Sequence, residues 1–183
     1  MNSFLHQASF ATGYWCYDRH RSVRLVVLVG LAIDQIAQSG LSSLSVIYYS
    51  AHLFSGKTSL ADITAGSDVA STTFKLKIVE CPSSLQSLKT TITGIKSVYS
   101  DTIINNSATG TKADYTGVSI ARSAAPTAPF TINATDDAKR LVWTAAEISS
   151  KEVSLIARMA ETKAGLATTG DFSAVATFNF EYQ

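Results

Sequence analysis

Charge and cysteine are both scarce in this chain, and each shortage excludes a class of protein. Only 16% of the 183 residues are charged, against roughly a quarter in ordinary globular domains, and 15 Lys and Arg nearly balance 14 Asp and Glu. A net charge of +1 provides no field to attract phosphate backbones or anionic lipid, so we expect no nucleic-acid partner. With two cysteines, three prolines and ten glycines, the chain is neither a disulfide-dense miniprotein nor a collagen-like segment.

A hydrophobic run long enough to cross a membrane is also missing. The longest run, residues 25–33 (LVVLVGLAI), is about half of the roughly 20 residues that a transmembrane helix needs, so we expect a chain that does not span a membrane. His20, Arg21 and Arg24 precede the run and small residues follow it, which is the order of a secretory signal. The run starts late for a signal, and the alternative is a short buried helix or strand.

Motifs for catalysis and metal binding are lacking as well. His6, His20 and His52 lie far apart and match no metal-ligand spacing. The GKT at residues 56–58 lacks the earlier glycine that a phosphate-binding loop requires. Because no nucleophile is paired with a base, we expect neither an enzyme nor a bound cofactor.

The chain is long enough for one domain, and its pattern of apolar and polar residues changes near residue 54. A length of 183 residues can bury a core but is short for two domains. Residues 1–54 contain Cys16, the histidines and the apolar run without steady alternation, whereas residues 55–183 alternate apolar with polar positions. We therefore divide the chain into an atypical N-terminal segment, 1–54, and a β-rich domain, 55–183.

Alternation in the second part predicts several strands. The clearest internal case is residues 73–80, where Phe74, Leu76 and Ile78 fall on one face and lysines on the other. Further strands are predicted at residues 88–92, 118–120 and 153–159, the last of which has a helical alternative. Segments rich in Ser, Thr, Asn, Gly and Pro predict loops at residues 100–113 and 123–137. Short strands at this spacing favour an all-β sandwich.

The C-terminal residues carry the longest alternation in the sequence. After Gly170, apolar residues occupy every second position: Phe172, Ala174, Ala176, Phe178, Phe180 and Tyr182. Such a run predicts a strand with one face in the core and leaves little room for a helix. The strand is either the edge of an unfinished sheet or an ordinary last strand of a closed sandwich.

The order of these features resembles the pilin subunits of chaperone-usher fimbriae, the type 1 fimbrial protein family. The resemblance covers about residues 60–183 and is most specific in the final strand, which in that family starts near a glycine and has a penultimate tyrosine, here Gly170 and Tyr182. FKLKIVECP at 74–82, LKTTITG at 88–94 and GVSI at 117–120 are similar to earlier strands of the family, in the same order. Among its members, the chain looks most like the minor or adaptor pilins.

The resemblance implies an incomplete immunoglobulin-like sandwich that lacks its last strand, with the core open beside the C-terminal strand. Leaving about five large apolar side chains exposed, at roughly 1.5–3 kcal/mol each, forfeits on the order of 10 kcal/mol, which is comparable to the whole stability of a domain. In the family, a periplasmic chaperone lends the missing strand, and the N-terminal extension of a neighbouring pilin subunit replaces it in the fibre. The implied route passes through the periplasm and an outer-membrane usher to an extracellular fimbrium.

The same resemblance implies roles for the final residues. The contacts with the chaperone or the next subunit would come from Gly170, Phe172, Ala174, Ala176, Phe178, Phe180, Tyr182 and Gln183. Ala174 and Ala176 would leave space for incoming side chains, and basic residues of the chaperone would hold the Gln183 carboxylate. The implied function is a structural subunit that supports cell adhesion through donor-strand exchange. The alternative is a receptor- or sugar-binding adhesin domain of similar fold.

The N-terminal part departs from the family. Its members carry a first cysteine in an early strand and an alternating donor segment ahead of it, and neither is evident here. The partner implied for Cys81 is Cys16, and a bridge closing a loop of about 65 residues would contribute roughly 4 kcal/mol. We hypothesise that residues 1–54 are not the native start of the subunit, because a shifted reading frame or a wrongly chosen start explains all the departures together.

Overall fold

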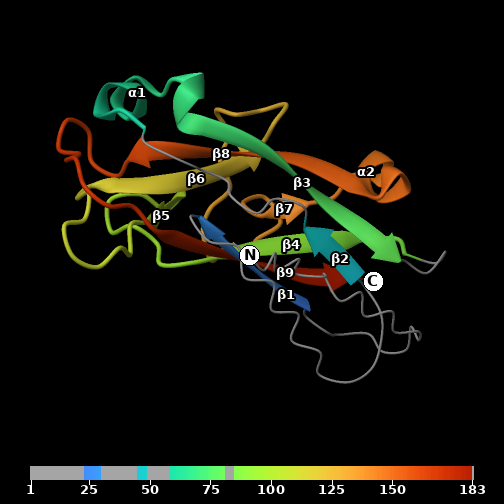
Figure 1. Ribbon diagram of the computed structural model, residues 1–183. Coiled ribbons are helices and arrows are strands. Elements are labelled where there is room, and N and C mark those ends of the chain that lie inside the picture. Colours follow the sequence, from blue (N-terminus) through green and yellow to red (C-terminus); the bar gives the residue numbers. More distant parts are fainter. Residues whose placement is uncertain (1–22, 30–44, 49–57, 81–84, 183) are drawn as a thin grey trace, which may run out of the picture.

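Two antiparallel β-sheets, packed as two layers, make up most of the computed structural model, which describes residues 23–29, 45–48, 58–80 and 85–182 (Figure 1). In this part of the chain the first sheet has the order β1 (Val23–Val29), β9 (Ala174–Tyr182), β4 (Leu88–Thr93), β7 (Leu141–Val142). The second has the order β2 (Ser45–Tyr48), β3 (Ser71–Glu80), β8 (Glu152–Glu161), β6 (Thr116–Arg122), β5 (Ile103–Asn105). The predicted all-β sandwich is confirmed.

Most of the predicted strands lie where the alternation placed them. β3, β4, β6 and β8 cover the four predicted runs, and burial alternates along β8 as a strand requires, so the helical alternative for residues 153–159 is excluded. Residues 123–137 form a loop, as expected. The prediction of a loop over residues 100–113 is wrong at β5, which is a strand because it pairs with β6 and not because of any pattern within its three residues.

Two short helices, α1 (Leu60–Ala65) and α2 (Ala145–Ser150), were not expected from periodicity, and their caps explain them. The Ser59 hydroxyl accepts from the backbone N–H of Asp62, and Gly66 ends α1 in the left-handed conformation. α2 opens with a capping box, in which Thr144 and Glu147 each accept from the backbone N–H of the other. A 3-10 helix, η1 (Asp68–Ala70), leads from α1 into β3.

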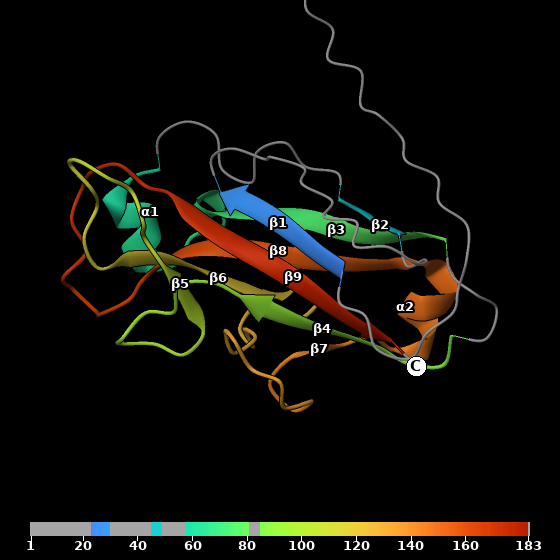
Figure 2. The ribbon, with the colours of Figure 1, turned by 90° about the horizontal axis from the view of Figure 1, so that it is seen from below.

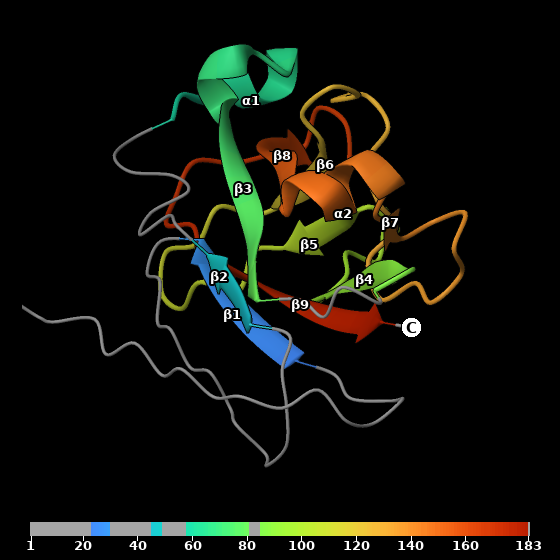
Figure 3. The same cartoon turned by 90° about the vertical axis from the view of Figure 1, so that its right-hand side faces the viewer.

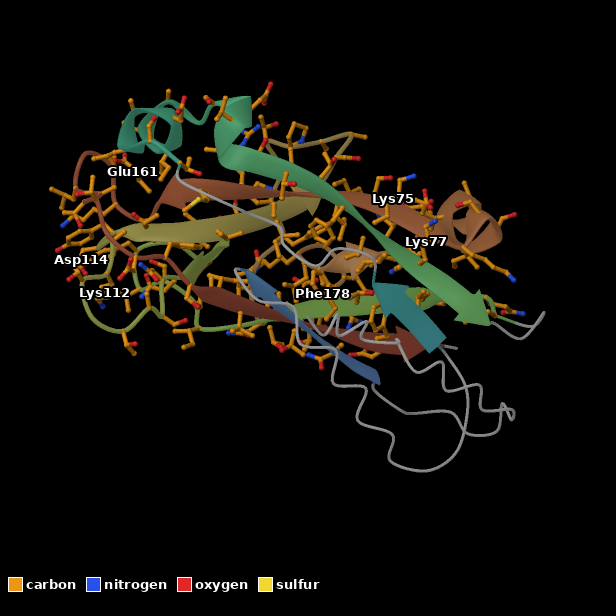
Figure 4. The ribbon with its side chains drawn as sticks, viewed as in Figure 1. Lys75, Lys77, Lys112, Asp114, Glu161 and Phe178 are labelled. Atoms are coloured by element: carbon orange, nitrogen blue, oxygen red, sulfur yellow. The ribbon has the colours of Figure 1, made fainter. Side chains whose placement is uncertain are left out.

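The core lies between the two layers and includes several buried aromatic residues. The rings of Phe74 on β3 and Phe178 on β9 meet edge to face with centroids 6.0 Å apart, the geometry that aromatic pairs prefer. Figure 4 places Phe178 between the layers. Trp143 follows β7 and is buried, and its indole Nε1 donates to the hydroxyl of the buried Thr90 on β4 at 2.9 Å. The core thus includes a buried hydrogen bond in which the indole N–H of Trp143 has its acceptor in the hydroxyl of Thr90.

The strands β1 and β2 lie on the same side of the sandwich, one on each sheet (Figures 2 and 3). β1 pairs antiparallel with β9, and β2 pairs antiparallel with β3. Residues 23–29 therefore form a strand, which was one of the alternatives to a secretory signal for the apolar run. The rest of that run, the three histidines and both Cys16 and Cys81 lie outside the described residues. The division of the chain after residue 54 stays a prediction.

No helix in the described part of the chain has the length and apolar character needed to cross a bilayer.

The buried pair of Thr90 and Trp143 gives the first prediction. We expect Thr90→Val to lower the free energy of unfolding by about 1–3 kcal/mol, because it leaves the indole N–H buried without an acceptor. The matched control is Thr73→Val on the exposed face of β3, where the change should stay within about 0.5 kcal/mol. Urea denaturation of both variants measures the difference, and equal losses would contradict the role of this hydrogen bond.

Candidate strand-docking edge

β9 is the strand that carries the predicted site, and its two edges have different neighbours. One edge pairs with β4, from Leu88 opposite Tyr182 to Thr93 opposite Thr177. The other edge pairs with β1. Among the described residues after 57, β4 is the only strand that pairs with β9. The C-terminal part of the chain thus leaves one edge of β9 to a strand from elsewhere, and we call this the free edge.

We expected an open groove beside β9. In the structure, β1 of the same chain occupies the free edge instead (Figure 2). Six of the seven residues of β1 are apolar, and four of them are register partners of core-facing residues of β9. The pairs are Val23 with Phe180, Leu25 with Phe178, Val27 with Ala176, and Val29 with Ala174. Because Val26 and Leu28 are apolar as well, the sequence of β1 does not by itself specify this register.

Burial along β9 follows the predicted alternation. The core-facing residues Ala174, Ala176, Phe178 and Phe180 are at most 1% exposed. Phe172 lies ahead of the strand, half-buried against the core, so β9 begins two residues later than the alternation suggested. The backbone of Tyr182 pairs with β4, whereas Gln183 lies outside the described residues. The predicted space beside Ala174 and Ala176 stays a prediction.

Gly170 sits where the chain turns into β9, at a point too narrow for a side chain. Its φ is +154°, and a Cβ there would lie 2.5 Å from the carbonyl carbon of Lys112 and 2.6 Å from the backbone N of Ala113. Just beyond it, the Asp171 N–H donates to the Thr111 carbonyl and the Ala113 N–H donates to the Asp171 carbonyl. Glycine is required because two backbones pass at close range.

Asn106 fixes the same entry to β9, and sequence reasoning missed it. Its side-chain amide donates to the carbonyls of Ala113 and Asp171, both at 2.8 Å, and its oxygen accepts from the N–H groups of Ala108 and Ser173. These four bonds use the whole capacity of an amide. Two partners lie 65 and 67 residues away in the chain, so no local pattern could have revealed the contact.

A family model of fimbrial proteins matches residues 55–183, which is more than half of the chain. The chain belongs to the fimbrial protein family. Its members are structural proteins and not enzymes, so this protein is a structural subunit of a surface fimbrium that assembles with other subunits. The match excludes β1 and β2, so the strand at the free edge comes from outside the family-like part. A search among curated proteins finds no match.

At its far end, β9 of this fimbrial subunit is held by a buried cation. Arg140 is 7% exposed in its side chain and binds Glu181 of β9 at 2.8 Å and Asp137 at 2.7 Å. Burial lowers the pKa of Arg140, but the hydrogen bonds to Asp137 and Glu181 outweigh it and the net direction is upward. Lys89 of β4 also binds Asp137 at 2.7 Å. Both ends of β9 are therefore anchored by polar contacts.

Within the described residues, no three His, Cys, Asp or Glu side chains come together in a way that could hold a metal ion.

The close approach at Gly170 gives a prediction for the entry to β9. We expect Gly170→Ala to lower the free energy of unfolding by about 3 kcal/mol, because the new Cβ meets backbone atoms and the positive φ is unfavourable. Gly165→Ala is the control, since it also has a positive φ but nothing within 4 Å of its Cβ, and should cost about 1 kcal/mol. Thermal unfolding compares the two, and a Gly170→Ala variant as stable as the control would contradict the requirement.

Acid should weaken the sandwich through its paired carboxylates. Hydrogen bonds from Lys89, Lys96 and Lys75 lower the pKa of Asp137, Asp101 and Glu152, respectively. A lowered pKa in the folded state contributes stability above the ordinary values of 3.8 and 4.5, and this stability is lost as the pH falls through the lower folded values. Urea midpoints should therefore fall as the pH drops from 5 towards 2.

Asp137→Asn serves as the control for this acid effect, because it removes one of the three titrating carboxylates. The variant should start with a lower urea midpoint at pH 7 and lose less of it in acid than the unaltered protein does. A midpoint that stays constant or rises on acidification would be incompatible with these ion pairs.

Proposed function

We propose that this fimbrial subunit belongs to a chaperone-usher system, as a minor or adaptor subunit, and assembles by donor-strand exchange at the free edge of β9. The observation that supports this most is that residues 58–182 pair only one edge of β9, with β4. The match to the family covers all of these residues but not β1. A strand from outside the family-like part is needed at the free edge, and a neighbouring subunit or a chaperone can supply one.

The energetic need for that strand comes from what β9 buries. Phe178 and Phe180 are fully buried, and each contributes roughly 1.5–3 kcal/mol when it is kept from water. A domain is stable by only about 5–15 kcal/mol in total, so losing the cover of the free edge removes much of the stability. An extended segment with alternating apolar residues meets the need, since backbone hydrogen bonds supply affinity and alternate side chains supply register.

β1, in which six of seven residues are apolar, occupies the free edge, and a donor strand has to displace it or fill its place. During export, a periplasmic chaperone lends its strand to the free edge and grips the carboxylate of Gln183. At the outer-membrane usher, the N-terminal extension of a neighbouring subunit takes over, and the fimbrium grows outside the cell and supports adhesion. The oxidising periplasm also permits a bridge between Cys16 and Cys81.

Strand exchange can be measured with the full chain and a fluorescent peptide of residues 20–31. The test variant combines Leu25→Asp with Val27→Asp, whose positions are the register partners of Phe178 and Ala176. The matched control combines Val26→Asp with Leu28→Asp, the register partners of Thr177 and Val175 on the other face. Because the test variant places charge at positions paired with core-facing residues of β9, we expect it to take up the peptide at least tenfold faster than the control.

A second arm adds a purified fimbrial chaperone and follows complex formation by size-exclusion chromatography. The test variant should form a one-to-one complex, while the control variant should remain largely monomeric. If the test variant is well folded and takes up neither peptide nor chaperone, strand exchange at β9 is not how this subunit assembles.

A further inference from the structure

Large apolar side chains gather on the surface at the end of the sandwich where β9 begins, opposite α2 (Figure 1). They lie in two connections, the loop between β4 and β5 and the loop between β8 and β9. We call these four residues the end patch: Ile95, Val98, Tyr99 and Leu166, which are between 42% and 89% exposed. Scattered apolar residues on a surface are ordinary, but a cluster at one end marks a contact with another protein.

The two loops of the end patch are fixed to each other and to the sheet. The Asn105 N–H donates to the Ile95 carbonyl at 2.7 Å, so the β4–β5 loop starts as an extra turn of pairing beside β5. The Leu166 N–H donates to the Lys163 carbonyl, and the ammonium of Lys163 lies 5.2 Å from the centre of the Tyr99 ring. A surface that is already ordered loses little conformational entropy when a partner binds.

The end patch is also hollowed. Val98 and Tyr99 line a hollow of about 270 Å³, together with Tyr115. The ring of Tyr115 lies 5.7 Å from that of Tyr99, and its φ of +53° is in the left-handed region that a bulky residue rarely adopts. Aromatic residues around a hollow are typical of the centre of a protein interface, where a side chain of the partner is received.

The charges around the end patch are paired. Lys96 binds Asp101 at 2.6 Å, and Lys112 lies 3.8 Å from Asp114. Because both signs are present together, this end of the sandwich has no field that would gather an anionic lipid or another polyanion. An apolar centre with a mixed polar rim favours a folded protein as the partner.

The direction of β1 indicates where a donor strand leaves the sandwich. β1 is antiparallel to β9, so its last residue, Val29, pairs with Ala174, the first residue of β9. The end patch starts at the same place, since a Cβ on Gly94 would lie 2.8 Å from the carbonyl oxygen of Val175. A donor strand that fills the place of β1 in the same direction therefore emerges beside the end patch.

In the proposed assembly, this direction separates the neighbouring subunit from the chaperone. An N-terminal extension is joined to the body of its subunit at its C-terminal end, which emerges beside the end patch. The chaperone grips the carboxylate of Gln183, which follows Tyr182 at the opposite end of β9. The neighbouring subunit is thus brought to the end patch, whereas the chaperone is held away from it.

We infer that the end patch docks the folded body of the neighbouring subunit whose N-terminal extension occupies the free edge. The inference rests on the proposed function and adds to it a second contact, between folded bodies, beside the donor strand. A head-to-tail contact of this kind repeats from subunit to subunit and produces an open fibre. Because the contact forms only in the fibre, burial of the end patch favours the fibre over the complex with the chaperone.

Site-specific cross-linking tests the contact in cells that carry the chaperone and usher of the same fimbrial system. The full chain carries a photo-reactive phenylalanine in place of Val98. We expect illumination to join position 98 to a neighbouring subunit in the fibre, and to give no product with the chaperone in the periplasm. The control label replaces Thr73 on the exposed face of β3 and should give at least tenfold less product.

A third label, in place of Val175, reports on strand exchange separately, because Val175 is the register partner of Leu28 in β1. If position 175 joins a neighbouring subunit and position 98 does not, strand exchange stands and the end patch is not a docking surface. Links from position 98 to the same chain or to the chaperone would also overturn the inference. A link to the neighbour from position 98 with none from position 175 would support the contact and refute strand exchange.

Fibre yield gives a second measurement. Val98→Asp combined with Leu166→Asp places charge on the end patch without touching the core, so we expect the yield of fimbriae to fall at least fivefold. In the background of Leu25→Asp with Val27→Asp, uptake of the peptide of residues 20–31 should be unchanged, because the peptide has no folded body. Thr73→Asp is the matched control, and a fibre yield equal to that of this control would overturn the inference.

Discussion

The pairing of β9 at both of its edges is the interaction on which the proposed assembly depends. β9 buries Phe178 and Phe180 and lies between β4 on one side and β1 on the other, and β1 lies outside the part of the chain that matches the fimbrial family. Within the described residues, the family-like part alone pairs only one edge of β9. In the proposed assembly, the identity of the strand at the free edge decides whether the subunit is a closed monomer or one unit of a fibre.

The two ends of β9 are anchored by polar side chains, and these contacts do not involve β1. Asn106 uses all four of its hydrogen bonds at the entry, and Arg140 binds Glu181 near the exit. In the proposed assembly, a donor strand replaces β1 while the ends of β9 and its pairing with β4 stay in place. Under this proposal, the anchored β9 is a fixed template for the incoming strand and does not fold on binding.

Much of the sheet architecture could be predicted from alternation, because burial at every second position appears within one short segment, as at Phe74, Leu76 and Ile78. The three residues of β5 could not, since their strand arises from pairing with β6. Gly170 was identified by its position, but the reason for it is the backbone of residues 111–113, which is distant in sequence. The register of β1 on β9 likewise depends on a pairing between residues about 150 apart, which no local pattern specifies.

The account depends most on β1 being an exchangeable neighbour of β9, and native-state hydrogen exchange of the full chain tests this directly. If β1 can leave the edge on its own, its amides will exchange through a local opening far cheaper than global unfolding, while amides in the β4–β9 and β3–β8 ladders stay protected up to the full stability. If instead β1 exchanges only with the global unfolding of the sandwich, the edge is closed for good and the subunit cannot accept another strand.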